Sequence, residues 1–69
     1  MEFSGTDLQN LRLVKKLTQE GVAAKLGFTQ QYYSKLEKKE IIDPAIVEKI
    51  LYCLNATKED LHLLKQLGG

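Results

Sequence analysis

Apolar residues recur every three or four positions along most of the chain, and polar or helix-breaking residues separate the runs. This spacing places apolar side chains on one face of a helix, whereas a half-buried strand would alternate apolar and polar residues. The pattern predicts five short helices and no strand, which is a compact all-α, five-helix bundle.

The first helix is predicted to begin near Thr6, with Gln9 three positions later as its capping-box partner. Leu8 and Leu11 recur on one face of this helix, and Leu17 closes the segment.

Two further helices follow with a short connection between them. Thr18 opens the second helix as an N-cap, because its hydroxyl can accept hydrogen bonds from free backbone N–H groups. Gly27 ends this helix in a sharp turn, since glycine adopts a positive φ at little cost. Thr29 caps the third helix, which is predicted over about residues 30–38. The residues expected to face the core are Val22, Ala23, Leu26, Tyr33 and Leu36, and Tyr32 is expected to face outward.

Start signals also mark the last two helices. Asp43 can cap the fourth helix, and Pro44 suits its first turn. Asn55 is expected to supply the left-handed residue at its end. Thr57 and Asp60 form a capping-box pair for the fifth helix. The predicted buried stripe of the fourth helix consists of Ile46, Val47, Ile50, Leu51 and Leu54, and the fifth helix carries Leu61, Leu64 and Leu67.

Composition narrows the class of protein. The chain has 69 residues, of which 43% are hydrophobic and 28% are charged. We expect one domain over residues 1–69 with its core in residues 6–67, and little room for a deep substrate cavity. The chain lacks an apolar run of the ~20 residues that span a membrane, and its N-terminus lacks a signal-peptide pattern. These absences indicate a cytoplasmic protein without a membrane partner.

Catalytic and metal-binding chemistry has few candidate residues. A single Cys cannot form an internal disulfide, and one Cys with one His cannot build a Cys/His zinc site. No Ser/His/Asp or Cys/His set stands out, and no glycine-rich phosphate loop follows a strand. The sequence predicts no enzyme activity, small-molecule substrate, metal or cofactor.

Charge is unevenly distributed along the chain. The formal net charge is +1, but residues 12–39 carry +5, and the segments on either side carry −2 each. A basic middle suits a polyanion bound by one face of the protein. The alternative is a solvated surface on which basic residues cluster by chance.

The most informative stretch is residues 17–37, which read LTQEGVAAKLGFTQQYYSKLE. Two short helices joined by a tight glycine turn are typical of a helix-turn-helix, here over residues 18–38. The stretch resembles the XRE/Cro-type helix-turn-helix repressors, which include phage repressors, and the resemblance extends over roughly residues 8–61. It implies a lambda repressor-like DNA-binding domain. The segment TQQYYSKLE is especially similar to the recognition helix of a lambdoid phage repressor.

The resemblance implies roles for individual residues. Gln30, Gln31 and Lys35 match recognition-helix positions that enter the major groove. Gln30 can bond both the donor and the acceptor of an adenine edge. Arg12 and Glu37 match a buried ion pair that ties the first helix to the third. The residues implied to contact the DNA backbone are Gln19, Thr29, Tyr32, Lys38 and Lys39, and Tyr32 can alternatively contact a thymine methyl group.

The sequence departs from the family pattern after the third helix. Family members often carry Gly at the position of Lys39, where another residue is strained or changes the turn. Glu40 and Asp43 would repel phosphate if they faced DNA. Ile41 and Ile42 are expected to pack on a partner, such as a second subunit. Together with Leu63, Leu64 and Leu67 of the fifth helix, they are the candidate dimer residues.

These observations favour a bacterial or phage-encoded protein that binds double-stranded DNA sequence-specifically and regulates or represses transcription. A single small domain buries little surface on DNA, so a homodimer on a palindromic operator is the expected working form. The alternative is a protein-interaction module of the same fold, such as an antitoxin part. The low net charge, Glu40 and Asp43 favour that alternative, whereas Gln30, Gln31 and Lys35 oppose it.

Overall fold

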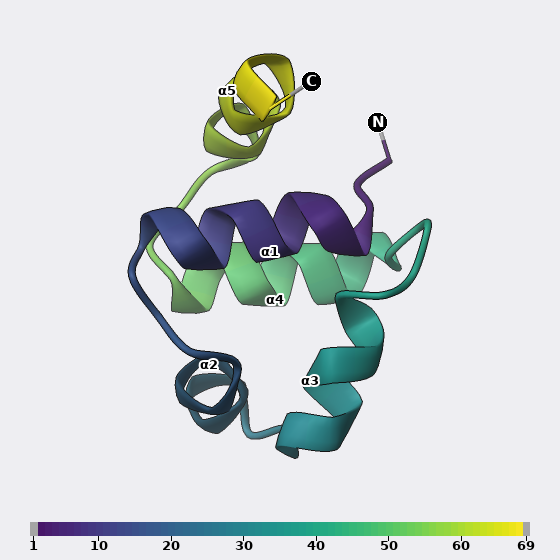
Figure 1. Ribbon diagram of the computed structural model, residues 1–69, viewed down its shortest axis with the longest axis vertical. Helices are drawn as coiled ribbons and strands as arrows, with labels where there is room; N and C mark the ends of the chain where they lie inside the picture. The colour runs from purple at the N-terminus through teal and green to yellow at the C-terminus, as the bar shows by residue number, and fades with distance from the viewer. Residues whose placement is uncertain (1, 69) are drawn as a thin grey trace.

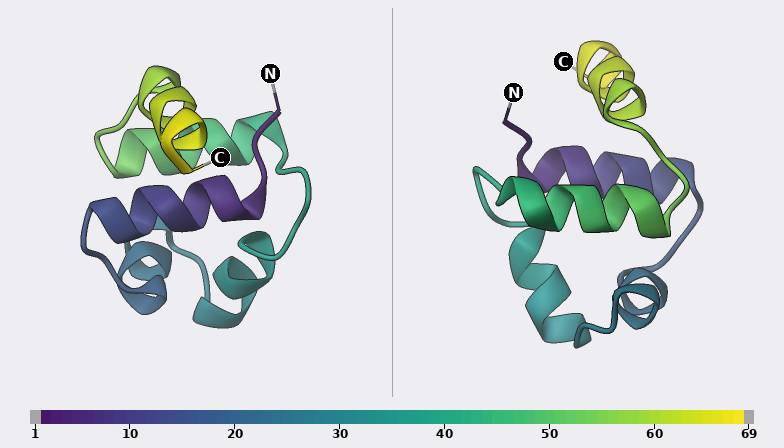
Figure 2. Two further views of the ribbon diagram at one scale, coloured as in Figure 1. Left: turned by 45° about the horizontal axis from the view of Figure 1, so that its top comes forward. Right: turned by 180° about the vertical axis from the view of Figure 1, so that it is seen from behind.

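The computed structural model describes residues 2–68, and these residues form five helices and no strand, as the apolar pattern predicts (Figure 1). Helices α1 and α4 run beside each other, α5 lies across one end of the molecule, and α2 and α3 lie at the other end (Figure 2). The helices are α1 (Gly5–Val14), α2 (Gln19–Leu26), α3 (Gln30–Leu36), α4 (Pro44–Cys53) and α5 (Lys58–Gly68).

Four helices begin at the caps that the sequence predicts. The Thr18 hydroxyl accepts from the Gly21 N–H at 3.0 Å, and the Thr29 hydroxyl accepts from the Tyr32 N–H at 3.1 Å. Asp43 caps α4, and Thr57 and Asp60 form the reciprocal box at the start of α5. These hydrogen bonds confirm the four predicted caps. The caps could be predicted because each side-chain acceptor lies within three residues of the backbone donor that it satisfies.

Helix α1 begins at Gly5, next to the expected Thr6, but its predicted cap is wrong by two residues. Ser4 is the N-cap, and it forms a reciprocal capping box with Asp7 in place of the expected pair Thr6 and Gln9. Gly5 then packs directly on the end of α3, where a Cβ atom would overlap the backbone of Leu36 and Glu37. The absence of a side chain at Gly5 therefore lets α1 start this close to α3.

Three helices end with a left-handed residue, at Lys16, Gly27 and Asn55. Beyond each, a backbone N–H returns to a carbonyl of the last turn, as from Phe28 to Ala23 at 2.9 Å. The turns at Gly27 and Asn55 are confirmed. The left-handed conformation of Lys16 (φ +59°) was not predicted, and α1 ends just before it, at Val14. Helix α3 likewise stops at Leu36, two residues before the predicted end.

Side chains from all five helices and the N-terminal segment form one buried cluster. Tyr33 is fully buried and Tyr32 is 42% exposed, so the expected division between the two tyrosines is confirmed. Of the described α5 side chains, Leu61 is fully buried, Leu64 is half-buried and Leu67 is 85% exposed. Helix α5 lies at the end of the bundle and packs mainly on α1, so most of its apolar face remains uncovered.

The loop between α3 and α4 is fixed by the N-terminal segment. The Gly5 N–H donates to the Lys39 carbonyl, and the Ile42 N–H donates to the Phe3 carbonyl, both at 2.8 Å. These bonds draw Ile42 into the core, where it is 1% exposed, whereas Ile41 is 56% exposed. The expectation that Ile42 offers a dimer surface is therefore wrong.

Among residues 2–68, no helix has both the length and the apolar character that crossing a membrane requires.

Candidate nucleic-acid interface

The unit formed by α2, its turn and α3 lies at the end of the molecule away from α5 (Figure 2). Gly27 adopts the left-handed conformation (φ +75°), and the half-buried Phe28 follows it and packs against the core. Thr29 then caps α3, so the chain changes direction within three residues. The sharp turn leaves one side of α3 covered by the core and the other side open to solvent.

The open side of α3 is polar. Gln30, Gln31 and Lys35 are exposed, while Tyr33 and Leu36 point into the core from the opposite side. This division follows the 3.6-residue helical period. The exposed side chains line a wide, shallow groove of about 410 Å³ between the start of α2 and α3, and the groove is lined by Gln19, Gln30, Gln31, Ser34, Lys35 and Lys38.

The groove thus brings together all three candidate base-reading residues and two of the five candidate backbone contacts, Gln19 and Lys38. Thr29 and Tyr32 lie at the first turn of α3 outside the groove lining, and Lys39 is exposed beyond the end of the helix. Ser34 also lines the groove. Sequence reasoning missed it, although its position four residues after Gln30 on the same helix face could have indicated it.

The ion pair expected between Arg12 and Glu37 is present. Arg12 Nε donates to Glu37 Oε2 at 2.7 Å, and both side chains are nearly buried. A second nitrogen of the guanidinium donates to the Leu17 carbonyl at 2.9 Å. The hydrogen bond to Glu37 raises the pKa of Arg12. Burial opposes ionisation of Glu37, but the hydrogen bonds from Arg12 and Gln19 outweigh burial and hold the pKa of its carboxyl below the usual value.

Gln19 has a structural contact that the sequence does not reveal. Its side-chain Nε2 donates to Glu37 Oε1 at 2.9 Å, so the start of α2 is tied to the residue that ends α3. The two residues are 18 positions apart, and no local pattern signals the bond. The Gln19 side chain is therefore already held in one position by Glu37 before any phosphate contact is made.

The Tyr33 hydroxyl is a second feature that the sequence does not signal. It is buried beside Arg12 and Glu37, and it has no hydrogen-bond partner among the described residues. Burial raises the pKa of this hydroxyl, and the nearby Glu37 carboxylate adds to the shift. The hydroxyl therefore remains neutral at physiological pH, next to an ionised pair.

The residues after α3 depart from the family pattern without backbone strain. Lys39 does not adopt a positive φ; within residues 2–68, the non-glycine residues that do are Lys16 and Asn55. The Asp43 carboxylate is used to cap α4, where its Oδ1 accepts from the Ala45 N–H at 2.9 Å. Glu40 is exposed on the loop.

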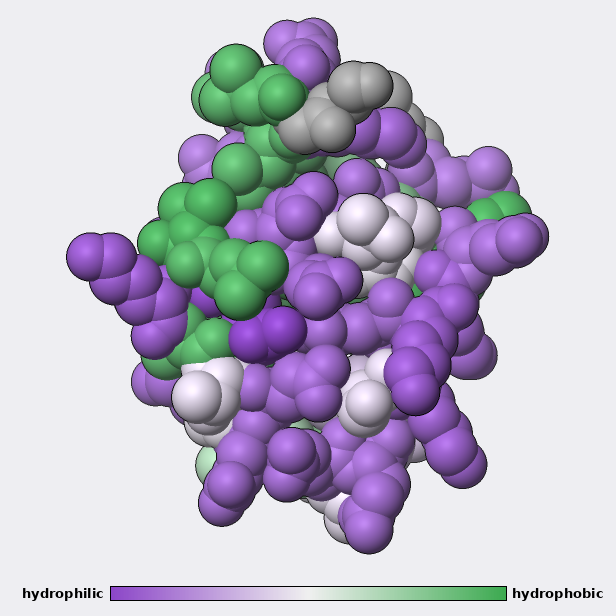
Figure 3. All heavy atoms as spheres, in the orientation of Figure 1, coloured by the Kyte–Doolittle hydropathy of each residue, from purple (hydrophilic) through white to green (hydrophobic). Residues whose placement is uncertain are grey.

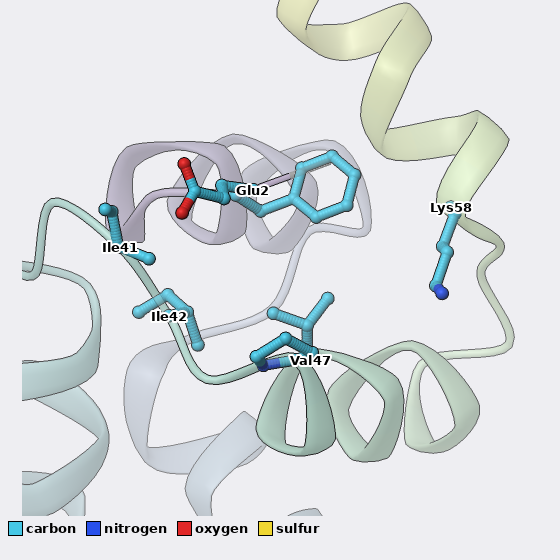
Figure 4. Close-up of a pocket in the computed structure, with 7 residues that line it drawn as sticks. Glu2, Ile41, Ile42, Val47 and Lys58 are labelled. Atoms are coloured by element: carbon cyan, nitrogen blue, oxygen red, sulfur yellow. The ribbon is translucent and has the colours of Figure 1, made fainter.

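The described part of the chain holds no group of three His, Cys, Asp or Glu side chains placed to bind a metal ion. A small pocket of about 90 Å³ lies between the N-terminal segment and the start of α4 (Figure 4). Its walls are mainly apolar, and Glu2 and Lys58 stand on opposite sides of it. This pocket has the chemistry of a gap in side-chain packing, with no converging titratable groups.

Comparison with known proteins agrees with this geometry. The family model described as helix-turn-helix matches residues 8–61, which include α2, its turn and α3. Neither a curated protein nor a solved structure matches the chain. Because the family match covers most of the chain, the protein belongs to the XRE/Cro-type helix-turn-helix family, a family of DNA-binding regulatory domains.

Proposed function

We propose that this chain binds double-stranded DNA sequence-specifically, with α3 in the major groove, and acts as a transcriptional regulator or repressor. The observation that carries the proposal is the groove along α3, which three amide or hydroxyl side chains of α3 and two lysines line together. A major groove is wide enough to admit an α-helix, and base edges there offer donors and acceptors that such side chains can bond.

Gln30, Gln31 and Lys35 are the proposed base-reading residues. The two glutamines occupy the first turn of α3, and Lys35 lies one turn further along the same open side. An adenine edge offers Gln30 one acceptor and one donor side by side, while a guanine edge offers Lys35 two acceptors. Each good two-bond contact discriminates against the wrong base by about 1–3 kcal/mol.

The DNA backbone is proposed to be held on both sides of these residues. Gln19 keeps a second amide hydrogen after its bond to Glu37, and that hydrogen can be donated to a phosphate. Lys38 and Lys39 follow α3 and supply positive charge near its end. Thr29 completes the proposed backbone set at the start of α3. Tyr32, in the same turn, is proposed to contact DNA either through the backbone or through a thymine methyl group. Backbone contacts fix orientation without reading sequence.

A homodimer on a palindromic operator is the proposed working form, with half-sites about 34 Å apart. An exposed apolar patch between α1 and α5 supports this proposal. Figure 3 shows hydrophobic atoms over the end of α1 and over α5. Two open hollows of about 240 and 460 Å³ lie between these helices. The patch consists of Leu13, Val14, Leu63, Leu64 and Leu67.

The patch revises the candidate dimer residues. Leu63, Leu64 and Leu67 were expected, whereas Leu13 and Val14 of α1 add to them. Ile41 is exposed, but it lies away from this patch. Its loop lies near the start of α1, since the Gly5 N–H donates to the Lys39 carbonyl. We therefore assign the proposed dimer contact to the α1–α5 patch, and Ile41 is a separate exposed residue.

The proposal treats residues 1–69 as one domain with the helix-turn-helix at residues 18–38, and Met1 and Gly69 lie outside the described residues. Its setting is the cytoplasm of a bacterium, with the protein encoded by the bacterium or by a phage. The rival function is a protein-interaction module, which the exposed Glu40 and the net charge of +1 favour.

Selection of bound duplexes from a random library tests the proposal. We expect one enriched sequence, repeated as two inverted half-sites about one helical turn apart. Enrichment of a single half-site would contradict the dimer. Recovery of no enriched sequence would contradict sequence-specific binding and favour the interaction module.

A further inference from the structure

An aromatic cluster lies at the start of α3 and is joined by a lysine of α4. The rings of Phe28 and Tyr32 meet at close to a right angle, with their centroids 4.9 Å apart. Lys49 of α4 places its ammonium group 4.8 Å from the centre of the Phe28 ring. Edge-to-face rings and a cation over a ring face are both favourable contacts. Phe28 is thus held from α3 and from α4.

The cluster restricts Tyr32 at both its ends. At the backbone, the Tyr32 N–H donates to the Thr29 hydroxyl at 3.1 Å, which fixes the first turn of α3. At the side chain, the Tyr32 ring rests against Phe28, which packs on the buried core. The ring nevertheless belongs to a residue that is 42% exposed. Tyr32 therefore presents apolar surface from a prearranged position.

The position of Tyr32 is next to the proposed base-reading residues. Successive residues of a helix point about 100° apart, so Gln30 and Tyr32 lie about 200° apart around α3, with Gln31 between them. Gln30 faces the groove that α2 borders, and Tyr32 lies on the opposite flank. Helix α3 consequently offers a polar centre with an aromatic edge.

From this arrangement we infer that Tyr32 reads a thymine through its methyl group, with Phe28 and Lys49 as positioning residues. The inference rests on the proposed function. Among the features that base edges present in the major groove, the thymine methyl is the apolar one. A ring already fixed by its neighbours loses little freedom on contact, so a small apolar contact is not cancelled by ordering the side chain.

Replacement of thymine by deoxyuridine tests the inference, because it removes the methyl group and leaves the base pairing intact. The probe is a duplex selected by the chain, with each thymine replaced in turn. We expect one position in each half-site at which the wild-type protein binds deoxyuridine roughly fourfold more weakly, which is the effect of losing one buried methyl group. At that position, Tyr32→Ala should bind both duplexes equally.

A matched variant separates the ring from the hydroxyl. Tyr32→Phe should retain the full preference for thymine, since it keeps the ring. If Tyr32 instead donates its hydroxyl to a phosphate, Tyr32→Phe would weaken all duplexes alike and deoxyuridine would have no effect. That result would overturn the inference.

The positioning role of Lys49 and Phe28 has its own readout. Lys49→Gln and Phe28→Leu should reduce the ratio of the affinity for the thymine duplex to that for the deoxyuridine duplex. Lys49→Arg should keep the wild-type ratio, because it keeps a cation over the Phe28 ring. Unfolding curves of the variants separate this effect from loss of the fold. A thymine preference unchanged in Lys49→Gln and Phe28→Leu would overturn the positioning role. Binding without any deoxyuridine effect would overturn the inference alone, whereas failure to bind any duplex would overturn the proposed function with it.

Discussion

Gln19 at the start of α2 donates its side-chain amide to Glu37 at the end of α3, with 2.9 Å between Nε2 and Oε1. The same carboxylate accepts from Arg12 of α1. Three helices therefore meet at one buried group, while Gly27 fixes the other end of the unit. The direction of the exposed face of α3 depends on this carboxylate as well as on the turn.

Replacing Glu37 should destabilise the protein strongly. Glu37→Gln removes the charge that compensates the buried Arg12, and leaving one partner of a buried pair unpaired costs about 3–5 kcal/mol. The free energy of unfolding in urea measures the loss. Glu48→Gln is the matched control, because Glu48 pairs with Lys58 at the surface with both side chains at least 60% exposed. It should cost less than about 1 kcal/mol. Equal losses in the two variants would contradict the structural role of Glu37.

Stability should fall on acidification through the Glu37 carboxyl. Its pKa is lower in the folded protein than its ordinary value of 4.5, so the folded state favours the ionised form. The stabilisation is therefore fully present above pH 4.5 and is lost as the pH falls below it toward the folded pKa. Urea unfolding of the wild type and Glu37→Gln should give a difference that is constant near neutral pH and narrows in acid. A difference that widens in acid would refute this assignment.

The contact between Gly5 and α3 predicts a second sensitive position. Gly5→Ala places a methyl group where the backbone of Leu36 and Glu37 lies, so α1 must move away from α3. Overpacking of this kind costs about 1–3 kcal/mol, and backbone on the opposing side places the effect at the upper end. Gly21→Ala serves as the control, because the nearest atom to its Cβ is the Thr18 hydroxyl at 3.2 Å. Thermal unfolding in which Gly5→Ala matched the wild type would show that α1 does not approach α3 as described.

Two variants should separate base reading from backbone contact. Gln30→Ala removes a proposed base contact, so it should reduce preference among operator sequences. Lys38→Ala removes a proposed backbone contact, so it should weaken every duplex by a similar factor. Titrations against the selected operator and against single-base variants measure both effects. Equal loss on all duplexes for both variants would mean that the roles are wrongly assigned.

The sequence was most informative where structure depends on neighbouring residues. Thr18, Thr29 and Asp43 cap helices through atoms two or three residues away, and Gly27 turns the chain by its own conformational freedom. Such effects can be predicted from a short window. The division of Tyr32 and Tyr33 between surface and core follows from the helical period in the same way.

Features that depend on contacts between distant segments could not be predicted from local pattern. Ser4 replaces Thr6 as the first cap because Gly5 fits against the end of α3. Ile42 is buried because its N–H bonds to the Phe3 carbonyl, 39 positions earlier in the chain. Leu67 has the spacing of a core residue, yet no helix covers it. The Arg12–Glu37 pair, whose residues lie 25 positions apart, was expected only through the family resemblance.

Binding of duplex DNA at two salt concentrations tests the central claim most directly. Lysines beside a phosphate backbone release bound counterions, so affinity should fall at least about tenfold between roughly 50 and 200 mM salt. The slope of log affinity against log salt should decrease by about 1 in Lys38→Ala. Absence of binding, or an affinity that does not change with salt, would contradict the account that the exposed face of α3 binds DNA.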